Sequence, residues 1–199
     1  MLKIVVIISG RGSNMQAIVE RSRSGKLKGL CEILHVISDR ESALGVQIAR
    51  NHGIPVICIP SAGKTREAFE KEVASFLQPL SPDYIVLAGF QRILSPFFTN
   101  LFRHRIVNIH PADPAEFRGL NGYQWAFEKK LATTRITVHF VDEGVDTGRI
   151  IAQKEINLTG MTTLEEIKKV GLKTEHEFYP AVLADLFLNK GRGGKICAE

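Results

Sequence analysis

Short β-branched apolar runs alternate with helical segments through the first half of the chain, and this alternation constrains the fold most. The runs occupy residues 4–8, 31–38, 54–59, 84–88 and 105–109. Several are apolar at consecutive positions, as expected for strands covered on both faces. Between them, segments such as 65–77 carry apolar residues at helical spacing. Strand–helix–strand repetition predicts parallel pairing with right-handed crossovers, and therefore a doubly wound α/β sheet.

The pattern changes after Gly119. A helix is expected near 122–131, and in 136–141 Thr137 and His139 alternate with apolar residues, which predicts a strand with one apolar and one polar face. A second strand is expected at 150–156. A capping box, Thr162-x-x-Glu165, opens a long final helix. We therefore expect a mostly parallel, Rossmann-like sheet with a C-terminal strand pair and a long C-terminal helix.

Composition favours one cytoplasmic domain. The 199 residues suffice for one core, so 1–199 is expected to be a single domain, with the Gly- and Lys-rich segment 189–199 as a flexible tail. The three cysteines form no C-x-x-C pair, which fits a reducing cytoplasm. No apolar run approaches the roughly 20 residues that span a bilayer, so no membrane association is expected.

The net charge of +5 comes from basic residues spread along the chain. This distribution indicates solubility or an anionic small ligand, with nucleic acid disfavoured.

The glycine-containing stretch S-G-R-G-S-N (9–14) joins the first strand to the first helix. Gly10 and Gly12 permit a tight turn, and the free N–H groups of the helix start favour a phosphate. The stretch is neither G-x-G-x-x-G nor a Walker loop, so a dinucleotide or a nucleoside triphosphate is not indicated. A plain turn, with Ser13 or Asn14 capping the helix, is the alternative.

Asn108 lies in the strand expected at 105–109, and His110 follows that strand directly. Period two places both side chains on one side of the strand, where an amide can donate to an oxyanion and an imidazole can donate or relay a proton. Asp146, between two glycines, could hold the His110 ring in one tautomer and raise its pKa. A structural histidine and an ordinary loop aspartate are the alternatives.

Residues 88–96, A-G-F-Q-R-I-L-S-P, could wall a flat aromatic cofactor or simply pack on the core. No group of His, Cys and Asp residues has the spacing of metal ligands, so no metal is expected.

These motifs recur together, in this order, in one known family: S-G-R-G-S-N, A-G-F-Q-R-I-L, N-I-H-P, V-H-F-V-D-E-G-V-D-T-G and E-H-E-F-Y-P. Over roughly residues 3–187 the sequence resembles the folate-dependent phosphoribosylglycinamide formyltransferase family. N-x-H-P with a downstream D-x-G marks the wider folate formyltransferases, and S-G-x-G-S-N points to the phosphoribosylglycinamide branch.

The resemblance implies transfer of the formyl group of the cosubstrate 10-formyltetrahydrofolate to the amine of glycinamide ribonucleotide, in purine synthesis. It implies no metal, no nucleic-acid or membrane partner, and a monomer or homodimer. The implied catalytic residues are Asn108, His110 and Asp146. The implied phosphate and ribose contacts are Gly12, Ser13, Asn14, Glu175 and Lys173. The implied folate contacts are Arg92, Ile93, Leu94, Val141, Asp142 and Asp146.

Two departures from the family pattern leave the acceptor open. H-P-A-D-P-A-E-F-R-G (110–119) stands where the family usually has H-P-S-L-L-P-x-x-x-G, so Asp113 could pair with Arg118 or face the acceptor. Leu172 takes the place of a basic, phosphate-directed residue, and Lys173 follows it. The alternatives are therefore a formyltransferase acting on another amine, a 10-formyltetrahydrofolate hydrolase, and a catalytically silent phosphate-binding domain.

Overall fold

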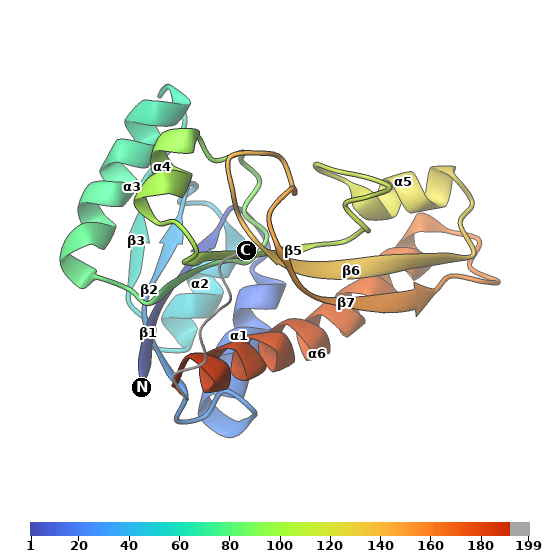
Figure 1. Cartoon of the computed structure of the whole chain (residues 1–199), viewed down its shortest axis with the longest axis horizontal. Helices are drawn as coiled ribbons and strands as arrows, with labels where there is room; N and C mark the ends of the chain where they lie inside the picture. Colours follow the sequence, from blue (N-terminus) through green and yellow to red (C-terminus); the bar gives the residue numbers. More distant parts are fainter. Residues whose placement is uncertain (192–199) are drawn as a thin grey trace.

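The five apolar runs of the first half form parallel strands at the centre of the molecule (Figure 1). The computed structural model describes residues 1–191. The parallel strands are β1 (Leu2–Ile8), β2 (Cys31–Ser38), β3 (Val56–Cys58), β4 (Tyr84–Leu87) and β5 (Ile106–His110). Two antiparallel strands, β6 (Thr133–Phe140) and β7 (Ile150–Asn157), continue the sheet. Its order is β3-β2-β1-β4-β5-β6-β7, which confirms the predicted mostly parallel, doubly wound sheet with a C-terminal strand pair.

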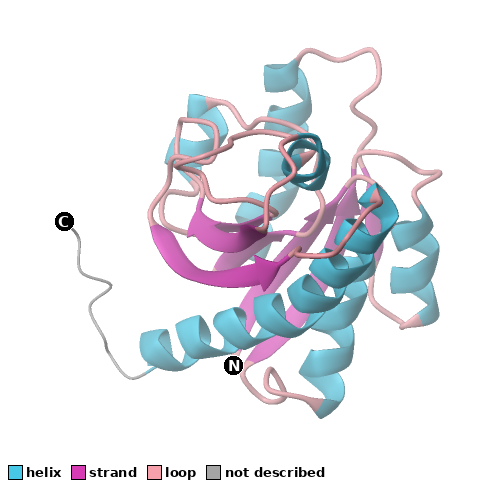
Figure 2. Cartoon of the chain, turned by 90° about the vertical axis from the view of Figure 1, so that its right-hand side faces the viewer, coloured by secondary structure: helices cyan, strands magenta, loops and turns pink. Residues whose placement is uncertain are grey.

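Helices cover both faces of the sheet (Figures 1 and 2). They are α1 (Ser13–Ser24), α2 (Leu44–Asn51), α3 (Arg66–Leu80), α4 (Pro96–Leu101), α5 (Gly122–Glu128) and α6 (Leu164–Gly191). Alternate residues of β1 serve two cores: Ile4 and Val6 pack with residues of α1 and α6, whereas Val5 and Ile7 pack with residues of α3 and α4. A strand buried on both faces needs no polar alternation, which explains the continuous apolar runs.

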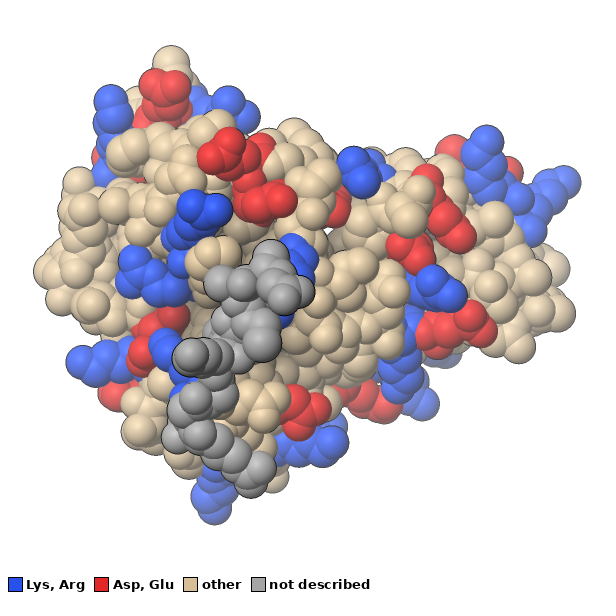
Figure 3. Space-filling model, in the orientation of Figure 1, with Lys and Arg blue, Asp and Glu red and all other residues tan. Residues whose placement is uncertain are grey.

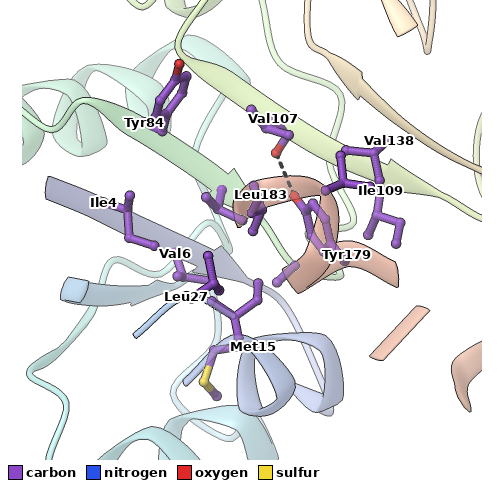
Figure 4. Packing of buried hydrophobic residues seen from close by; sticks show 14 of the residues in the cluster. Ile4, Val6, Met15, Leu27, Tyr84, Val107, Ile109, Val138, Tyr179 and Leu183 are labelled. Atoms are coloured by element: carbon purple, nitrogen blue, oxygen red, sulfur yellow. Dashed lines mark hydrogen bonds between the residues drawn. The ribbon is translucent and has the colours of Figure 1, made fainter. Parts of the chain in front are cut away.

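Tyr179 attaches α6 to the sheet. Its fully buried hydroxyl lies 3.1 Å from the Leu87 carbonyl oxygen and 3.0 Å from that of Val107, within a cluster of apolar side chains (Figure 4). Leu87 ends β4 and Val107 precedes Asn108 in β5. The long C-terminal helix is therefore fixed directly behind the carboxyl edge of the sheet.

Two caps differ from the sequence prediction. The N-cap of α1 is Gly12, with φ 74°, rather than Ser13 or Asn14. A Cβ at Gly12 would lie 2.5 Å from the Gly45 Cα, so the close approach of α2 selects glycine here. The capping box of α6 lies one residue later than predicted, at Thr163 and Glu166, whose side chains each accept the other's backbone N–H at 3.2 and 3.0 Å.

The C-terminal helix extends to Gly191, so the first three residues of the segment predicted as a tail are helical. Lys190 donates to Asp83 at 2.8 Å. The rest of that segment, including Cys197, lies outside the described residues.

The polar face of β6 is turned inward. Thr137 and His139 are almost completely buried, whereas Thr133 and Arg135, at the far end of the same face, reach solvent. Thr137 donates to the Ala112 carbonyl at 2.8 Å. This face therefore packs on the segment that follows β5.

On the face of the molecule drawn in Figure 3, Lys and Arg are interspersed with Asp and Glu. Within residues 1–191, no helix is both long and apolar enough to cross a bilayer. The same residues contain no group of three or more His, Cys, Asp and Glu side chains placed to hold a metal ion.

Candidate active site

A cleft of about 550 Å³ opens at the carboxyl edge of the parallel strands, where an open α/β sheet ordinarily binds its ligand. Leu87 of β4 and Asn108 and His110 of β5 form its floor. Residues 89–94 form one wall and residues 141–146 another. Three segments far apart in the sequence thus meet around the end of β5.

Asn108, His110 and Asp146 are brought together in this cleft. The His110 Nδ1 atom lies 3.4 Å from Oδ2 of Asp146, and His110 is 3% exposed. The backbone N–H of Gly119 donates to the same Oδ2 at 2.8 Å. The side chains that the sequence nominated separately therefore share one site.

His139 is a fourth member that the sequence analysis missed. It lies opposite Asn108 in the β5–β6 pair, and its Nε2 is 3.3 Å from the Asn108 amide nitrogen. The same Nε2 is 3.3 Å from Oδ1 of Asp146, so each carboxylate oxygen of Asp146 faces one imidazole. The sequence shows that His139 lies on the polar face of 136–141. It does not show the β5–β6 register that places His139 beside Asn108.

Backbone carbonyls fix the protonation of both rings. His110 Nε2 lies 2.9 Å from the Phe117 carbonyl oxygen, and His139 Nδ1 lies 2.8 Å from that of Phe140. A carbonyl only accepts, so each of these nitrogens carries a proton. The nitrogens that face Asp146 are then unprotonated in the neutral rings and available to bind a proton beside a carboxylate.

Burial lowers the pKa of His110 below its ordinary 6.5, although the Asp146 carboxylate and the Phe117 carbonyl act to raise it. The sequence analysis expected Asp146 to raise this pKa; the carboxylate does so, but burial outweighs it. Burial also acts to raise the pKa of Asp146. Hydrogen bonding from His139 when its Nε2 carries a proton, the charge of His110 when that ring is protonated, and the Gly119 N–H outweigh that effect and hold the pKa below 3.8. At neutral pH the site thus holds an ionised Asp146 carboxylate beside a neutral His110 ring.

The loop that carries Asp146 is tightly constrained. Asp146 itself has φ 51°, in the left-handed region that costs a non-glycine residue free energy. The Asp142 carboxylate accepts from the Thr147 hydroxyl at 2.6 Å and from the Gly144 N–H at 3.1 Å. The surrounding loop therefore maintains a backbone conformation that presents Asp146 to His110.

Residues 89–94 line the cleft and also pack on the core, which are the two roles left open for 88–96. Leu94 is buried in a core cluster yet contacts the cleft, whereas Ile93 is 54% exposed. The Arg92 guanidinium lies over the Phe69 ring at 5.3 Å and donates to the Ser61 hydroxyl at 3.1 Å. Arg66, which the sequence analysis did not nominate, lines the same cleft. Two guanidinium groups therefore flank an otherwise largely apolar wall.

Comparison with known proteins identifies the family. Residues 2–183 match the Formyl transferase family. Phosphoribosylglycinamide formyltransferase of Escherichia coli (strain K12) is 36% identical over 184 residues, 92% of this chain and 86% of that protein. The Bacillus subtilis (strain 168) protein of the same name is 35% identical over 196 residues, 98% of this chain and 100% of that protein. The crystal structure of glycinamide ribonucleotide transformylase 1 from Symbiobacterium toebii matches with a TM-score of 0.89 and 35% identity, covering 96% of this chain and 89% of that chain. The chain belongs to the phosphoribosylglycinamide formyltransferase family.

Asn14 and Glu175, two of the residues that the family resemblance assigned to phosphate and ribose, form a separate cluster where α1 meets α6. Asn14 and Tyr123 donate to the two carboxylate oxygens of Glu175, which is 5% exposed. Burial raises the pKa of Glu175, while the two hydrogen bonds act to lower it. Gly12 is the N-cap of α1 and Ser13 is its first residue. The backbone N–H groups at the start of α1 are therefore close to Glu175, which Asn14 of the same turn contacts. Tyr123 was not nominated from the sequence.

Lys173 is not brought to this cluster. It is exposed, and two residues along an α-helix turn about 200° around the axis, so its side chain points away from that of Glu175. A second cavity of about 310 Å³ adjoins the cleft. It is lined by Pro111, Asn121, Gly122, Tyr123, Gln124 and Lys168.

Asp113, the departure from the family pattern, pairs with Arg135 rather than with Arg118. The Arg135 Nη1 atom lies 2.8 Å from Oδ2 of Asp113, whereas Arg118 donates to the Pro114 carbonyl at 2.9 Å. Asp113 is 8% exposed and is not among the described residues that line the cleft. Its charge is therefore directed at β6 and not at the acceptor.

Proposed function

We propose that this chain transfers the formyl group of 10-formyltetrahydrofolate to the amine of glycinamide ribonucleotide in purine biosynthesis. The observation that carries the proposal is the cluster of Asn108, His110 and Asp146 in the cleft of a chain that belongs to this family. We further infer that the whole chain works as one domain in the cytoplasm; the free thiols of Cys31 and Cys58 fit a reducing compartment.

The chemistry follows from the groups present. The acceptor amine attacks the formyl carbon, a C–N bond forms, and the formyl oxygen becomes an oxyanion. The Asn108 amide and, once its Nδ1 is protonated, the His110 imidazolium are the donors available to stabilise it. His110 Nδ1, supported by Asp146, can hold the proton that the amine loses. The bond from the formyl carbon to N10 then breaks, and N10 receives a proton.

The two ends of the site suit the two substrates. The cleft between residues 89–94 and 141–146 has apolar walls for a pterin, and Arg66 and Arg92 complement the carboxylates of the folate glutamate. The start of α1 offers backbone N–H groups to the phosphate of the acceptor, and Glu175 offers a polar group to its ribose. No contact of Asp113 favours a different amine.

The test is to mix the purified protein with 10-formyltetrahydrofolate and follow release of tetrahydrofolate by absorbance, with and without glycinamide ribonucleotide. Release that requires glycinamide ribonucleotide supports the proposal. Equal release without it identifies a hydrolase, and release only with another amine changes the acceptor. Failure to bind the folate leaves the catalytically silent domain.

A further inference from the structure

The segment between β5 and α5 makes contacts that the proposed reaction does not use. Asp113 begins a single helical turn: its carbonyl accepts the N–H groups of Glu116 and Phe117, each at 2.9 Å. Its Oδ1 accepts the Ala115 N–H at 3.0 Å, as a helix-capping aspartate does. The side chain of Asp113 therefore fixes the turn that ends at Phe117.

The turn is tied to β6 at two points. Arg135 donates to Asp113 at 2.8 Å, and Thr137 donates to the Ala112 carbonyl at 2.8 Å. Arg135, Thr137 and His139 alternate along one face of β6, so the strand that carries His139 into the site also holds the turn. The Ala115 N–H, and after it Arg135, keep the pKa of Asp113 below its ordinary value, so the tie is ionic at neutral pH.

The turn ends against His110. The Phe117 carbonyl accepts His110 Nε2–H at 2.9 Å. The Phe117 ring lies parallel to the His110 ring at 6.4 Å and to the Trp125 ring at 5.0 Å. Position and tautomer of His110 thus depend on where this turn is held.

We propose that Asp113 and Arg135 are positioning residues for His110, acting through the Phe117 carbonyl. They keep the proton on Nε2, where the Phe117 carbonyl accepts it, and leave Nδ1 free to take up the proton of the reaction beside Asp146. The kinetic part of this inference rests on the proposed formyl transfer.

The variants are Asp113→Asn and Arg135→Met. Asp113→Asn removes the charge with little change of shape. The Arg135 side chain is 48% exposed, so it can be replaced without unfolding the core. Asp83→Asn and Lys190→Met are the matched controls. Asp83 also accepts a backbone N–H, that of Lys3, and a basic side chain, each at 2.8 Å.

The first measurement is the ¹⁵N signal of the His110 imidazole in the protein without substrate. The ionisable groups that act on this ring are Asp146, His139 and Asp113, so the spectra are recorded as pH titrations. In the wild type we expect a neutral ring protonated at Nε2. In Asp113→Asn and Arg135→Met we expect a larger share protonated at Nδ1, and no change in the controls.

The second measurement is kinetic. We expect kcat to fall about tenfold in Asp113→Asn and in Arg135→Met, the scale of one charge-assisted hydrogen bond. The KM for the folate should stay within about twofold, and the double variant should lose little more than either single variant.

Folded variants that keep the wild-type tautomer and kcat would overturn the inference. The tautomer is measured without substrate, so it is informative even if no transfer to glycinamide ribonucleotide occurs. Such a failure of transfer would count against the proposed function alone.

Discussion

Asp146 is the side chain on which most of the site depends. Its two carboxylate oxygens face His110 and His139 at 3.4 and 3.3 Å, and its backbone has a positive φ of 51°. A residue held in the left-handed region and shared by two imidazoles supports the proposed catalytic role of Asp146.

Replacing Asp146 by Asn should lower kcat by about 100-fold or more, the scale for acid–base groups. Asn tolerates the left-handed region, so the loop should keep its shape while the charge is lost. His110→Ala should have an effect of similar size. Steady-state kinetics with both substrates is the measurement, and the exposed Asp185→Asn in α6 is the control. Near-normal turnover in either variant would remove that residue from the mechanism.

Burial of His110 should make the protein less stable in mild acid. The pKa of His110 is below 6.5 in the native state, and that of the half-buried His176 is shifted the same way. Below pH 6.5 the unfolded chain therefore binds more protons than the native chain, and the free energy of unfolding decreases as the pH falls. Urea unfolding between pH 7.5 and 5.5 measures this slope, which should be shallower in His110→Asn. A slope unchanged by that substitution would show that His110 does not titrate differently on folding.

Glu175 should have the opposite effect. Its pKa is raised above 4.5 by burial, so the native state binds the extra proton above that value. Its contribution to stability is lost as the pH rises through the folded pKa. Glu175→Gln should therefore reduce the decrease in the free energy of unfolding that occurs as the pH rises through the folded pKa of Glu175.

At the scale of elements, the loop between β6 and β7 decides whether Asp146 reaches the cleft. A Cβ at Gly148 would lie 1.8 Å from the Phe140 carbonyl oxygen, so only glycine fits where the loop returns to the sheet. Asn100 of α4 also donates to Glu143 of this loop at 2.7 Å. The loop thus passes close to β6 where it returns to the sheet, and it is bonded to α4.

Gly148→Ala should displace the loop and lower kcat about tenfold or more, because a shift of 1 Å in a catalytic group is costly. The folate KM should rise as well, since residues 141–146 line the cleft. Gly160→Ala is the control: Gly160 has φ 82° in a distant turn, so that variant should lose stability but keep kcat. Equal loss of kcat in both variants would mean that general destabilisation is responsible.

At the scale of the whole molecule, α6 holds the carboxyl edge of the sheet in place. The Tyr179 hydroxyl bonds carbonyls of both β4 and β5, and the helix also supplies Glu175. The C-terminal helix is therefore bonded directly to β4 and β5, the two strands that end at the site.

Tyr179→Phe should lower the free energy of unfolding by about 1–3 kcal/mol, because it removes a buried donor from two carbonyls. Tyr84→Phe, which keeps a ring stacked on Phe187 at 5.3 Å, should change it by less than about 0.5 kcal/mol. Urea unfolding monitored by circular dichroism compares the two. Equal effects would argue against the anchoring role of the Tyr179 hydroxyl.

The sheet was predictable because buried parallel strands give continuous apolar runs, and Asn108 and His110 were predictable because period two places them together. His139 and Tyr123 were not, since their roles depend on the β5–β6 register and on the packing of α5 against α6. The partner of Asp113 was also beyond the sequence: Arg118 is closer along the chain, but Arg135 is brought to it by β6. The cap of α1 was misplaced because the contact between Gly12 and Gly45 is tertiary.

The central claim is that formyl transfer to glycinamide ribonucleotide occurs in this cleft. The most direct measurement uses 10-formyltetrahydrofolate labelled with ¹³C in the formyl group and detects labelled formylglycinamide ribonucleotide by mass spectrometry. The account predicts stoichiometric transfer of the label by the wild type and a rate reduced about 100-fold or more in Asp146→Asn. Label recovered as formate, or transfer that Asp146→Asn leaves unchanged, would contradict it.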